Sequence, residues 1–293
     1  MIRGLYTAAA GMIAQERIHD ALTNNIANVQ TAGYKQDQVV ERSFPELLIQ
    51  RIRDGQPQLV GPLNTGVYAQ ELIPTFTPAP IVETNQPLEL AIDDSRMPAL
   101  PIGENETVAP RLFFKVLDQN GEISYTRQGR FFLDGSGYLV TPEGYQVLDG
   151  ENEPIQLLNE YDQPFDPTMS NLFIDGQGNV VYRNPDYPLQ TTEELGKIDL
   201  VLITNPNELV KAGTGYYRYQ NGNAAPAPTE DATAAYLATQ SGVKQGFIEK
   251  SNVDPATTVS DMMQALRVYE ANQKVLQSYD QLLGRAVNDL AKI

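Results

Sequence analysis

One histidine is the first group in this sequence that could do acid–base chemistry. His19 lies between Gln15 and Leu22 on one face of an expected helix, a position typical of a histidine packed at a helix interface rather than of a catalytic base. The sequence has no G-x-S-x-G nucleophile motif. It also has no cysteine, which excludes disulfides, Cys-based catalysis and Cys/His zinc clusters. We therefore expect no catalytic residue around His19.

Acidic residues are the second candidates, as cation ligands or as a pair of glycosidase carboxylates. The turns at 118–122 (DQNGE) and 134–138 (DGSGY) bring oxygens together, but they lack the acidic spacing and distal glutamate of an EF-hand loop. The same turns are typical of ordinary β-hairpins. We therefore expect no metal site.

Carboxylate pairs for glycoside hydrolysis are Glu104 with Glu106, in a loop-like stretch, and Asp93 with Asp94, after an expected strand. Neither pair has aromatic sugar platforms nearby, and the chain has no tryptophan. GTGYY at 213–217 lacks the lysine of a phosphate-binding loop. We expect no enzymatic activity, no cofactor and no small-molecule substrate.

The overall charge excludes another class of partner. The 293 residues carry a formal net charge of −16, with 21 Lys+Arg against 37 Asp+Glu, and we find no basic patch. Such a surface repels phosphate backbones, so we expect no nucleic-acid partner. No apolar run approaches the ~18 residues needed to span a bilayer, and the first residues do not form a convincing signal peptide.

The elements that would position any functional residue are helical at both ends of the chain. In the N-terminal part, apolar residues recur at spacings of three and four up to Gly33, a plausible left-handed residue after the helix. The stretch NNIANVQTAGYK (24–35) closes this pattern with three asparagines, which are unfavourable inside helices. The expected apolar seam comprises Leu5, Ala8, Met12, Gln15, His19, Leu22, Ile26 and Val29.

The C-terminal helix has a clearer start. Asp254 can cap it and Pro255 suits its first position. Its expected seam comprises Val259, Met262, Leu266, Tyr269, Gln273, Leu276, Asp280, Leu283, Val287 and Leu290.

A seam of this length needs a partner helix, and the N-terminal helix matches it. Two interpretations stay open: a helical hairpin within the chain, or a pair that also packs against other subunits. The polar seam residues favour the second interpretation, because polar groups at such positions can fix register and partner choice.

Between the helices the pattern has a period of two. Short strands are predicted around 112–117, 123–127, 130–133, 138–141, 172–175, 179–182 and 199–204, separated by turn sequences. DGSG at 134 and DGQG at 175 look alike and suggest repeated use of one hairpin turn. The stretches 72–80 and 221–235 are rich in proline or in small residues, and they indicate joints between domains.

Both ends and the middle resemble the flagellar basal-body rod and hook protein family of the distal-rod type. LYTAAAGM (5–12) with NNIANVQTAGYK resembles its N-terminal signature, and QGFIEKSNVD (245–254) with ALRVYEANQKVLQSYDQLL (265–283) its C-terminal signature. YTRQGRF (125–131) and GYLVTPEGYQVL (137–148) resemble its β domain. Residues 93–111 depart from the family pattern and look like an insertion at a strand junction.

The resemblance implies an α+β fold, with an antiparallel all-β central domain and long terminal helices that pair as a coiled-coil-like hairpin. The implied organisation is an N-terminal helix at 1–34, an extended connecting segment at 35–83, a β domain at 84–220, a linker and return segment at 221–250, and a C-terminal helix at 251–293 pairing with 1–34.

The resemblance also implies a structural subunit of the bacterial flagellar basal-body rod, self-assembling into the driveshaft that transmits torque from motor to hook. Its partners would be itself, other axial rod and hook subunits and the flagellar export apparatus. It would lie in the extracytoplasmic basal body, exported without a cleaved signal peptide and without membrane insertion. A cell-wall-remodelling enzyme and a secreted adhesin-like envelope protein are the alternatives.

On this interpretation no residue is catalytic, and the asparagines with Gly33 shape the junction to the next subunit or segment. The residues expected in helix packing or assembly are Leu5, Met12, Leu22, Asn24, Asn25, Ile26, Asn28, Val29, Gly33, Met262, Leu266, Tyr269, Asn272, Leu276, Leu283 and Val287.

Overall fold

The chain divides into two compact units, each built from separate stretches of sequence. The computed structural model describes residues 2–45, 47–53, 56–63, 66–101, 107–158, 167–169, 171–182, 193–219, 226, 228, 233, 236 and 242–290. Unit 1 comprises Met1–Ala27, Asp37–Ile73 and Val253–Ile293, and unit 2 comprises Asn28–Gln36 and Pro74–Asn252. The chain therefore passes between the units four times, after residues 27, 36, 73 and 252. Most of the linker expected at 221–250, and residues 102–106 of the insertion, lie outside the described residues.

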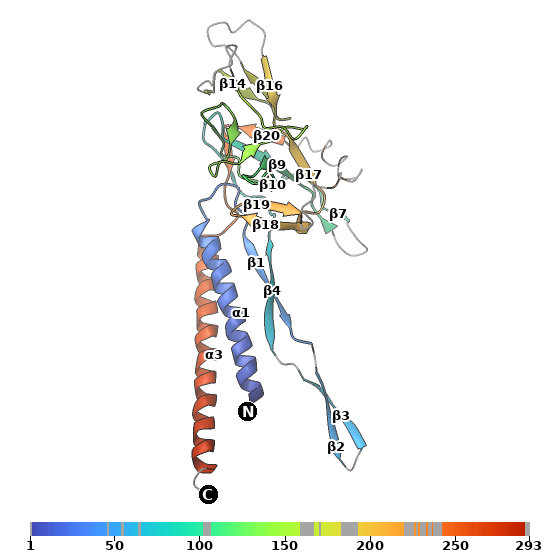
Figure 1. The fold of residues 1–293 in the computed structure, drawn as a ribbon, viewed down its shortest axis with the longest axis vertical. Helices are drawn as coiled ribbons and strands as arrows, with labels where there is room; N and C mark the ends of the chain where they lie inside the picture. The colour runs from blue at the N-terminus through green and yellow to red at the C-terminus, as the bar shows by residue number, and fades with distance from the viewer. Residues whose placement is uncertain are drawn as a thin grey trace. The chain divides into compact units, whose positions relative to one another are not determined.

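Unit 1 contains the terminal helices, α1 (Ile2–Ala27) and α3 (Pro255–Leu290), which lie side by side and antiparallel (Figure 1). Asp254 caps α3 by accepting a hydrogen bond from the Ala256 backbone N–H at 3.0 Å, as predicted. The expectation of terminal helices around a β-rich centre is confirmed. Within the described residues, neither helix has an apolar stretch long enough to cross a membrane.

Two glycines allow α1 and α3 to approach closely. A Cβ added to Gly4 would lie 2.2 Å from the Tyr279 hydroxyl, and one added to Gly11 would lie 2.9 Å from the Asn272 side-chain nitrogen. Larger residues at these positions would force a side chain to move or the helices to separate. Asn272, expected in the helix packing, therefore does face α1.

The face that α3 turns to α1 differs in part from the expected seam. The buried and half-buried positions of α3 alternate at spacings of four and three: Thr258, Met262, Ala265, Tyr269, Asn272, Leu276, Tyr279, Leu283 and Ala286. Met262, Tyr269, Leu276 and Leu283 lie on this face as expected, whereas Leu266 and Val287 are 44% and 64% exposed. Apolarity alone favours larger side chains and so does not identify Ala265 and Ala286, which lie on this face.

A hairpin-like excursion completes unit 1. Strand β1 (Asp37–Ser43) pairs with β4 (Val67–Pro74), and between them β2 (Leu47–Arg53) pairs with β3 (Gln56–Leu63) (Figure 1). Arg17 on α1 donates a hydrogen bond from Nη1 to the Ala69 carbonyl at 3.2 Å, which holds β4 against the helix.

Unit 2 is a β domain in which the recorded strand pairings are antiparallel. Its larger sheet has the order β11-β12-β13-β9-β10-β19-β18, with β17 also paired to β9; the smaller ones are β14-β15-β16, β20-β6, β21-β5 and β7-β8. The bounds are β5 Ile81–Glu83, β6 Leu90–Asp93, β7 Leu100–Pro101, β8 Thr107–Val108, β9 Arg111–Leu117, β10 Ile123–Thr126, β11 Phe132–Leu133, β12 Leu139–Val140, β13 Gln146–Val147, β14 Leu172–Ile174, β15 Asn179–Tyr182, β16 Glu193–Lys197, β17 Leu200–Ile203, β18 Leu209–Gly213, β19 Tyr216–Tyr219, β20 Gly242–Gln245 and β21 Phe247–Glu249. A single 3₁₀ turn (Pro206–Glu208) precedes β18 among these residues.

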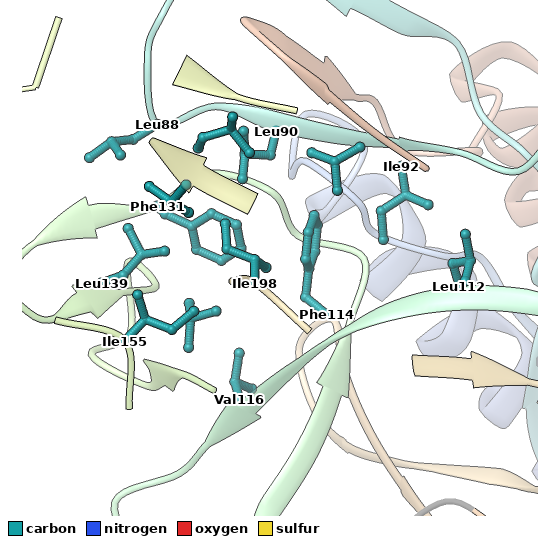
Figure 2. Close-up of a cluster of buried hydrophobic side chains, with 14 of the residues drawn as sticks. Leu88, Leu90, Ile92, Leu112, Phe114, Val116, Phe131, Leu139, Ile155 and Ile198 are labelled. Atoms are coloured by element: carbon teal, nitrogen blue, oxygen red, sulfur yellow. The ribbon is translucent and has the colours of Figure 1, made fainter. Parts of the chain in front are cut away.

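The core of unit 2 is organised around β9, which is buried on both faces. Leu112, Phe114 and Val116 point into the main apolar cluster, whereas Phe113 packs in a second cluster on the opposite face. In the main cluster the rings of Phe114 and Phe131 meet edge to face, with centroids 5.1 Å apart (Figure 2). The central strand therefore fixes both apolar layers of the domain.

Hairpin turns of unit 2 share one geometry. In each, an aspartate Oδ1 accepts backbone N–H bonds from residues two and four positions later, at Asp118, Asp134, Asp149 and Asp175. The residue three positions after each aspartate has a positive φ, at Gly121, Gly137, Asn152 and Gly178. The predicted likeness of DGSG and DGQG thus reflects a shared turn, and its carboxylates serve the backbone.

We expect Gly121→Ala to lower the free energy of unfolding less than Gly178→Ala. The backbone φ is +80 at Gly121 and +86 at Gly178. Either change to alanine therefore imposes about 1–2 kcal/mol of backbone strain. At Gly178 the new Cβ would also lie 2.4 Å from the Ile198 carbonyl oxygen, whereas at Gly121 no atom lies within 4 Å. Urea unfolding of both variants measures the difference, and equal losses would show that the close approach at Gly178 is unimportant.

Candidate functional site

Four charged side chains are buried together in unit 2, where the chain enters and leaves it. Lys35 lies just before the chain first leaves unit 2, Asp94 directly follows β6, Arg127 directly follows β10 and Glu249 ends β21. None is more than 3% exposed. We call these four residues the crossover cluster. Buried charges require partners and hydrogen bonds, so their pairing determines how these segments lie.

Glu249 is the centre of the crossover cluster. Its Oε1 accepts a hydrogen bond from Lys35 Nζ at 2.6 Å and one from the Ala79 backbone N–H at 3.2 Å. Its Oε2 accepts from Arg127 Nε at 2.9 Å. Its backbone carbonyl accepts from the Gly33 N–H at 2.8 Å. One residue therefore joins the segments around residues 33–35, 79 and 127.

Arg127 connects Glu249 to the second carboxylate. It donates from Nη1 to Asp94 Oδ2 and to the Leu112 carbonyl, both at 2.7 Å. Asp94 Oδ2 also accepts from the Leu112 N–H at 3.2 Å. Two cations thus face two carboxylates, and the four formal charges of the cluster balance.

The electrostatic effect of burial differs between the members. Burial alone would raise the pKa of the Asp94 carboxyl, but the charge and hydrogen bonds of Arg127 hold this pKa below its usual value. Burial alone would lower the pKa of the Arg127 guanidinium, but Glu249 and Asp94 raise it above its usual value. For Lys35, burial and then the positive charge of Arg127 lower the pKa to about 8, although Glu249 opposes them. Lys35 is therefore the member whose charge is least well compensated.

Gly33 allows the segment 28–36 to pack closely against the crossover cluster. Its φ is +66, and an added Cβ would lie 2.3 Å from the carbonyl carbon and oxygen of Arg127. The predicted left-handed conformation is present, but α1 already ends at Ala27, so Gly33 shapes the following turn rather than closing the helix. Only glycine satisfies both the conformation and the close approach.

The asparagines of the opening stretch act within the chain. Asn25 is buried, donates from Nδ2 to the Asp37 carbonyl and accepts on Oδ1 from the Asp37 N–H, both at 2.9 Å. Asn28 Oδ1 accepts from the Thr31 hydroxyl at 3.2 Å. Asn24 is exposed and lines a cavity of about 380 Å³ together with Arg17. Of the expected junction to the next subunit or segment, Asn25 makes the one to the next segment, because it holds the start of β1 on α1.

The other predicted residues of α1 are near its packed faces. Leu22 is buried, whereas Leu5, Met12 and Ile26 are half-buried. Val29 lies beyond the end of the helix, in the turn, and is half-buried. His19 is half-buried and lines a small cavity with Gln15 and Tyr269. Participation of these residues in assembly stays a prediction.

Sequence reasoning missed Arg127, Glu249 and the role of Asp94. Arg127 and Glu249 lie inside the motifs quoted above, but nothing in a single sequence indicates that they are buried and paired. Asp93 and Asp94, the candidate carboxylate pair, form separate ion pairs: Asp93 with Lys244 at 2.6 Å and Asp94 with Arg127. Glu104 and Glu106 lie outside the described residues.

Comparison with known families matches three parts of the chain. Residues 5–35 match the model described as "Flagella basal body rod protein", residues 110–182 "Flagellar hook protein FlgE/F/G D1 domain", and residues 244–290 "Flagellar basal body rod FlgEFG protein C-terminal". Lys35, Arg127 and Glu249 each lie in a different matched part. These parts therefore meet in the crossover cluster.

Comparison with individual proteins finds relatives along the whole chain. The chain is 35% identical to the flagellar hook-basal body complex protein FlhO of Bacillus subtilis, covering 100% of both chains. It is 29% identical to the flagellar basal-body rod protein FlgG of the same organism, covering 98% of this chain and 99% of the relative. It is 30% identical to FlgG of Borreliella burgdorferi, covering 98% of each.

We expect Lys35→Met to remove a pH dependence of stability. Above pH 8 the folded chain has lost the Lys35 proton, whereas the unfolded chain keeps it up to its ordinary pKa of 10.5. The unfolded state then binds more protons, so the free energy of unfolding of the wild type rises relative to Lys35→Met between pH 8 and 10.5, by up to roughly 1.4 kcal/mol per pH unit. Urea unfolding at several pH values from 7 to 9.5 measures this gap, and a constant gap would contradict the assigned pKa.

We expect Glu249→Gln to destabilise unit 2 at pH 7, by roughly 3–5 kcal/mol. The change leaves Lys35 and Arg127 buried with only Asp94 to balance them. The exposed Glu153→Gln, in a hairpin turn, is the matched control and should change stability by less than about 0.5 kcal/mol. Urea unfolding of both variants checks this, and similar losses would mean that Glu249 is not central.

Proposed function

Because the chain belongs to the family of flagellar hook-basal body and rod proteins, we propose that it is a rod subunit that self-assembles through its terminal helices into the torque-transmitting driveshaft. The observation that carries the proposal is the similarity to FlhO along both whole chains, with family matches at both termini. The family gives the chain a structural role in the flagellar basal body.

The exposed apolar flanks of α3 support assembly through the helices. Val268, Val275 and Leu282 follow one another at seven-residue spacing beside the face that contacts α1, and they are 39%, 42% and 51% exposed. Leu266 and Val287 lie on the other side of that face. In a two-stranded coiled coil such flanking positions are usually charged, so apolar residues there favour contact with further helices.

We propose that the helix pair is a coiled-coil-like hairpin with apolar surface beside its contact face; the alternating spacing of four and three on α3 supports this. The exposed Tyr6 and Ile13 on α1, also seven residues apart, add to this surface. Subunits that pack through different patches on each other make contacts that do not close, and these contacts generate filaments. A filament transmits torque only if each subunit keeps its fold under load, and we assign to the crossover cluster the role of holding together the segments of unit 2.

We also propose partners and a location for the chain. The chain assembles with copies of itself and with other axial rod and hook subunits, and it passes through the flagellar export apparatus without cleavage of a signal peptide. It acts outside the cytoplasm and has no catalytic function. The engagement of Asp93 and Asp94 in separate ion pairs leaves the cell-wall-enzyme alternative without support from that pair, and the relatives named above give none to an adhesin.

We expect deletion of the gene to leave cells without hooks and filaments, and the wild-type chain to restore them. Leu282→Asp should fail to restore swimming although the isolated variant keeps its free energy of unfolding within about 0.5 kcal/mol, because Leu282 is exposed in the single chain. Gln281→Asp, an exposed neighbour with the same added charge, should restore swimming. Motility assays and electron microscopy of the complemented strains measure both.

Leu276→Asp tests the other face of α3. Leu276 faces α1, so this variant should destabilise the isolated helix pair as well as abolish swimming. Normal swimming with Leu282→Asp would contradict assembly through the flank. Normal hooks in the deletion strain would contradict the rod assignment itself.

A further inference from the structure

Residues 37–73 leave unit 2 and return to it at two neighbouring points. The chain leaves after Gln36 and re-enters at Pro74. At this base, the Thr75 N–H donates a hydrogen bond to the Gln36 carbonyl at 2.8 Å. Lys35 Nζ also donates a hydrogen bond to the Thr77 carbonyl at 2.8 Å. Two bonds are a weak closure for a long excursion, because each net hydrogen bond typically contributes only about 1 kcal/mol.

The side-chain amide of Asn252 adds three hydrogen bonds at this base. Its Oδ1 accepts from the Gln36 N–H at 2.7 Å. Its Nδ2 donates to the Thr75 carbonyl at 2.8 Å and to the Thr77 hydroxyl at 2.9 Å. The amide thus acts as a strand partner to both ends of the excursion, accepting from one and donating to the other.

Asn252 comes from far along the sequence. It is separated from Gln36 by 216 positions and from Thr75 by 177. It lies three residues after the end of β21, which pairs with β5 and ends at Glu249 in the crossover cluster. The side chain can therefore reach the base only after the C-terminal segment of unit 2 has docked.

The ordering of residues 37–73 depends on hydrogen bonds that hold their two ends together. Closing a loop of this length has an entropic cost that grows with the logarithm of its length, and isolated two-stranded hairpins are marginally stable in water. β1–β4 and β2–β3 are separate two-stranded sheets. In unit 1, Asn25 bonds Asp37, so the residue next to Gln36 is also held by an asparagine amide.

We propose that Asn252 is a positioning residue that fastens the base of the excursion and makes its ordering conditional on docking of the C-terminal segment. Among the described residues, before the C-terminal segment docks, the base keeps only the Thr75–Gln36 backbone bond and the bond from Lys35 Nζ to the Thr77 carbonyl, and α1 holds the start of β1. The strands β1 and β4 therefore become ordered only after β21, the last strand of the β domain, has paired with β5. This concerns the isolated chain and holds whatever the chain assembles into.

Hydrogen–deuterium exchange of the isolated full-length chain tests the proposal. Asn252→Ala removes the bonds to Gln36, Thr75 and Thr77, so amides in 36–43 and 67–75 should exchange at least roughly tenfold faster. Amides of β9 and β10 should be unchanged. Asn252→Asp keeps an acceptor for Gln36 but loses the donors, so it should give a smaller increase in the same peptides.

The matched control is Asn205→Ala, which removes an amide that accepts from the Asn207 N–H elsewhere in unit 2. It should leave 36–43 and 67–75 unaffected. Faster exchange throughout unit 2 with both Asn252 variants would show a general loss of stability and overturn the proposal. Unchanged exchange in the excursion would overturn it equally.

Discussion

The buried carboxylate of Glu249 is the interaction on which the arrangement of unit 2 depends. A carboxylate that is 2% exposed must have its oxygens satisfied by hydrogen bonds and opposite charge. Lys35, Arg127 and the Ala79 N–H meet this requirement, and they come from segments far apart in the sequence. Satisfying one side chain therefore brings together residues 33–35, the returning segment at Ala79 and the end of β10 in the larger sheet.

The cluster is built for specificity more than for stability. Arg127 is well compensated by two carboxylates, whereas the Lys35 ammonium is held at an energetic cost that its lowered pKa reveals. A buried charge of this kind disfavours alternative packings, because any shift of the segment 28–36 would leave the Lys35 ammonium buried without its partners. Asn25 and Asn252 have a similar effect through neutral amides. Asn25 bonds the N–H and C=O groups of Asp37, and Asn252 bonds the N–H of Gln36 and the C=O of Thr75.

Local sequence patterns predicted the elements but not what joins them. Asp254, Pro255 and the D-x-x-G turns identified the start of α3 and several hairpins, because capping and positive φ are decided by neighbouring residues. The apolar spacing of α3 fits two adjacent faces equally well, and only the glycines of α1 select the one with Ala265 over the one with Leu266. The early end of α1 and the pairing of Lys35, Arg127 and Glu249 depend on contacts between distant segments, which periodicity does not encode.

The chain resembles its family along its whole length, and its helix pair has exposed apolar flanks. The crossover cluster holds the segments of unit 2 together. These features suit a subunit that assembles and bears load. The most direct measurement is mass spectrometry of basal bodies purified from motile cells after hooks and filaments have been removed. The account predicts that peptides of this chain remain in the basal bodies together with the other rod proteins. Recovery of the chain only in the wall fraction or the culture medium, with intact basal bodies lacking it, would contradict the account.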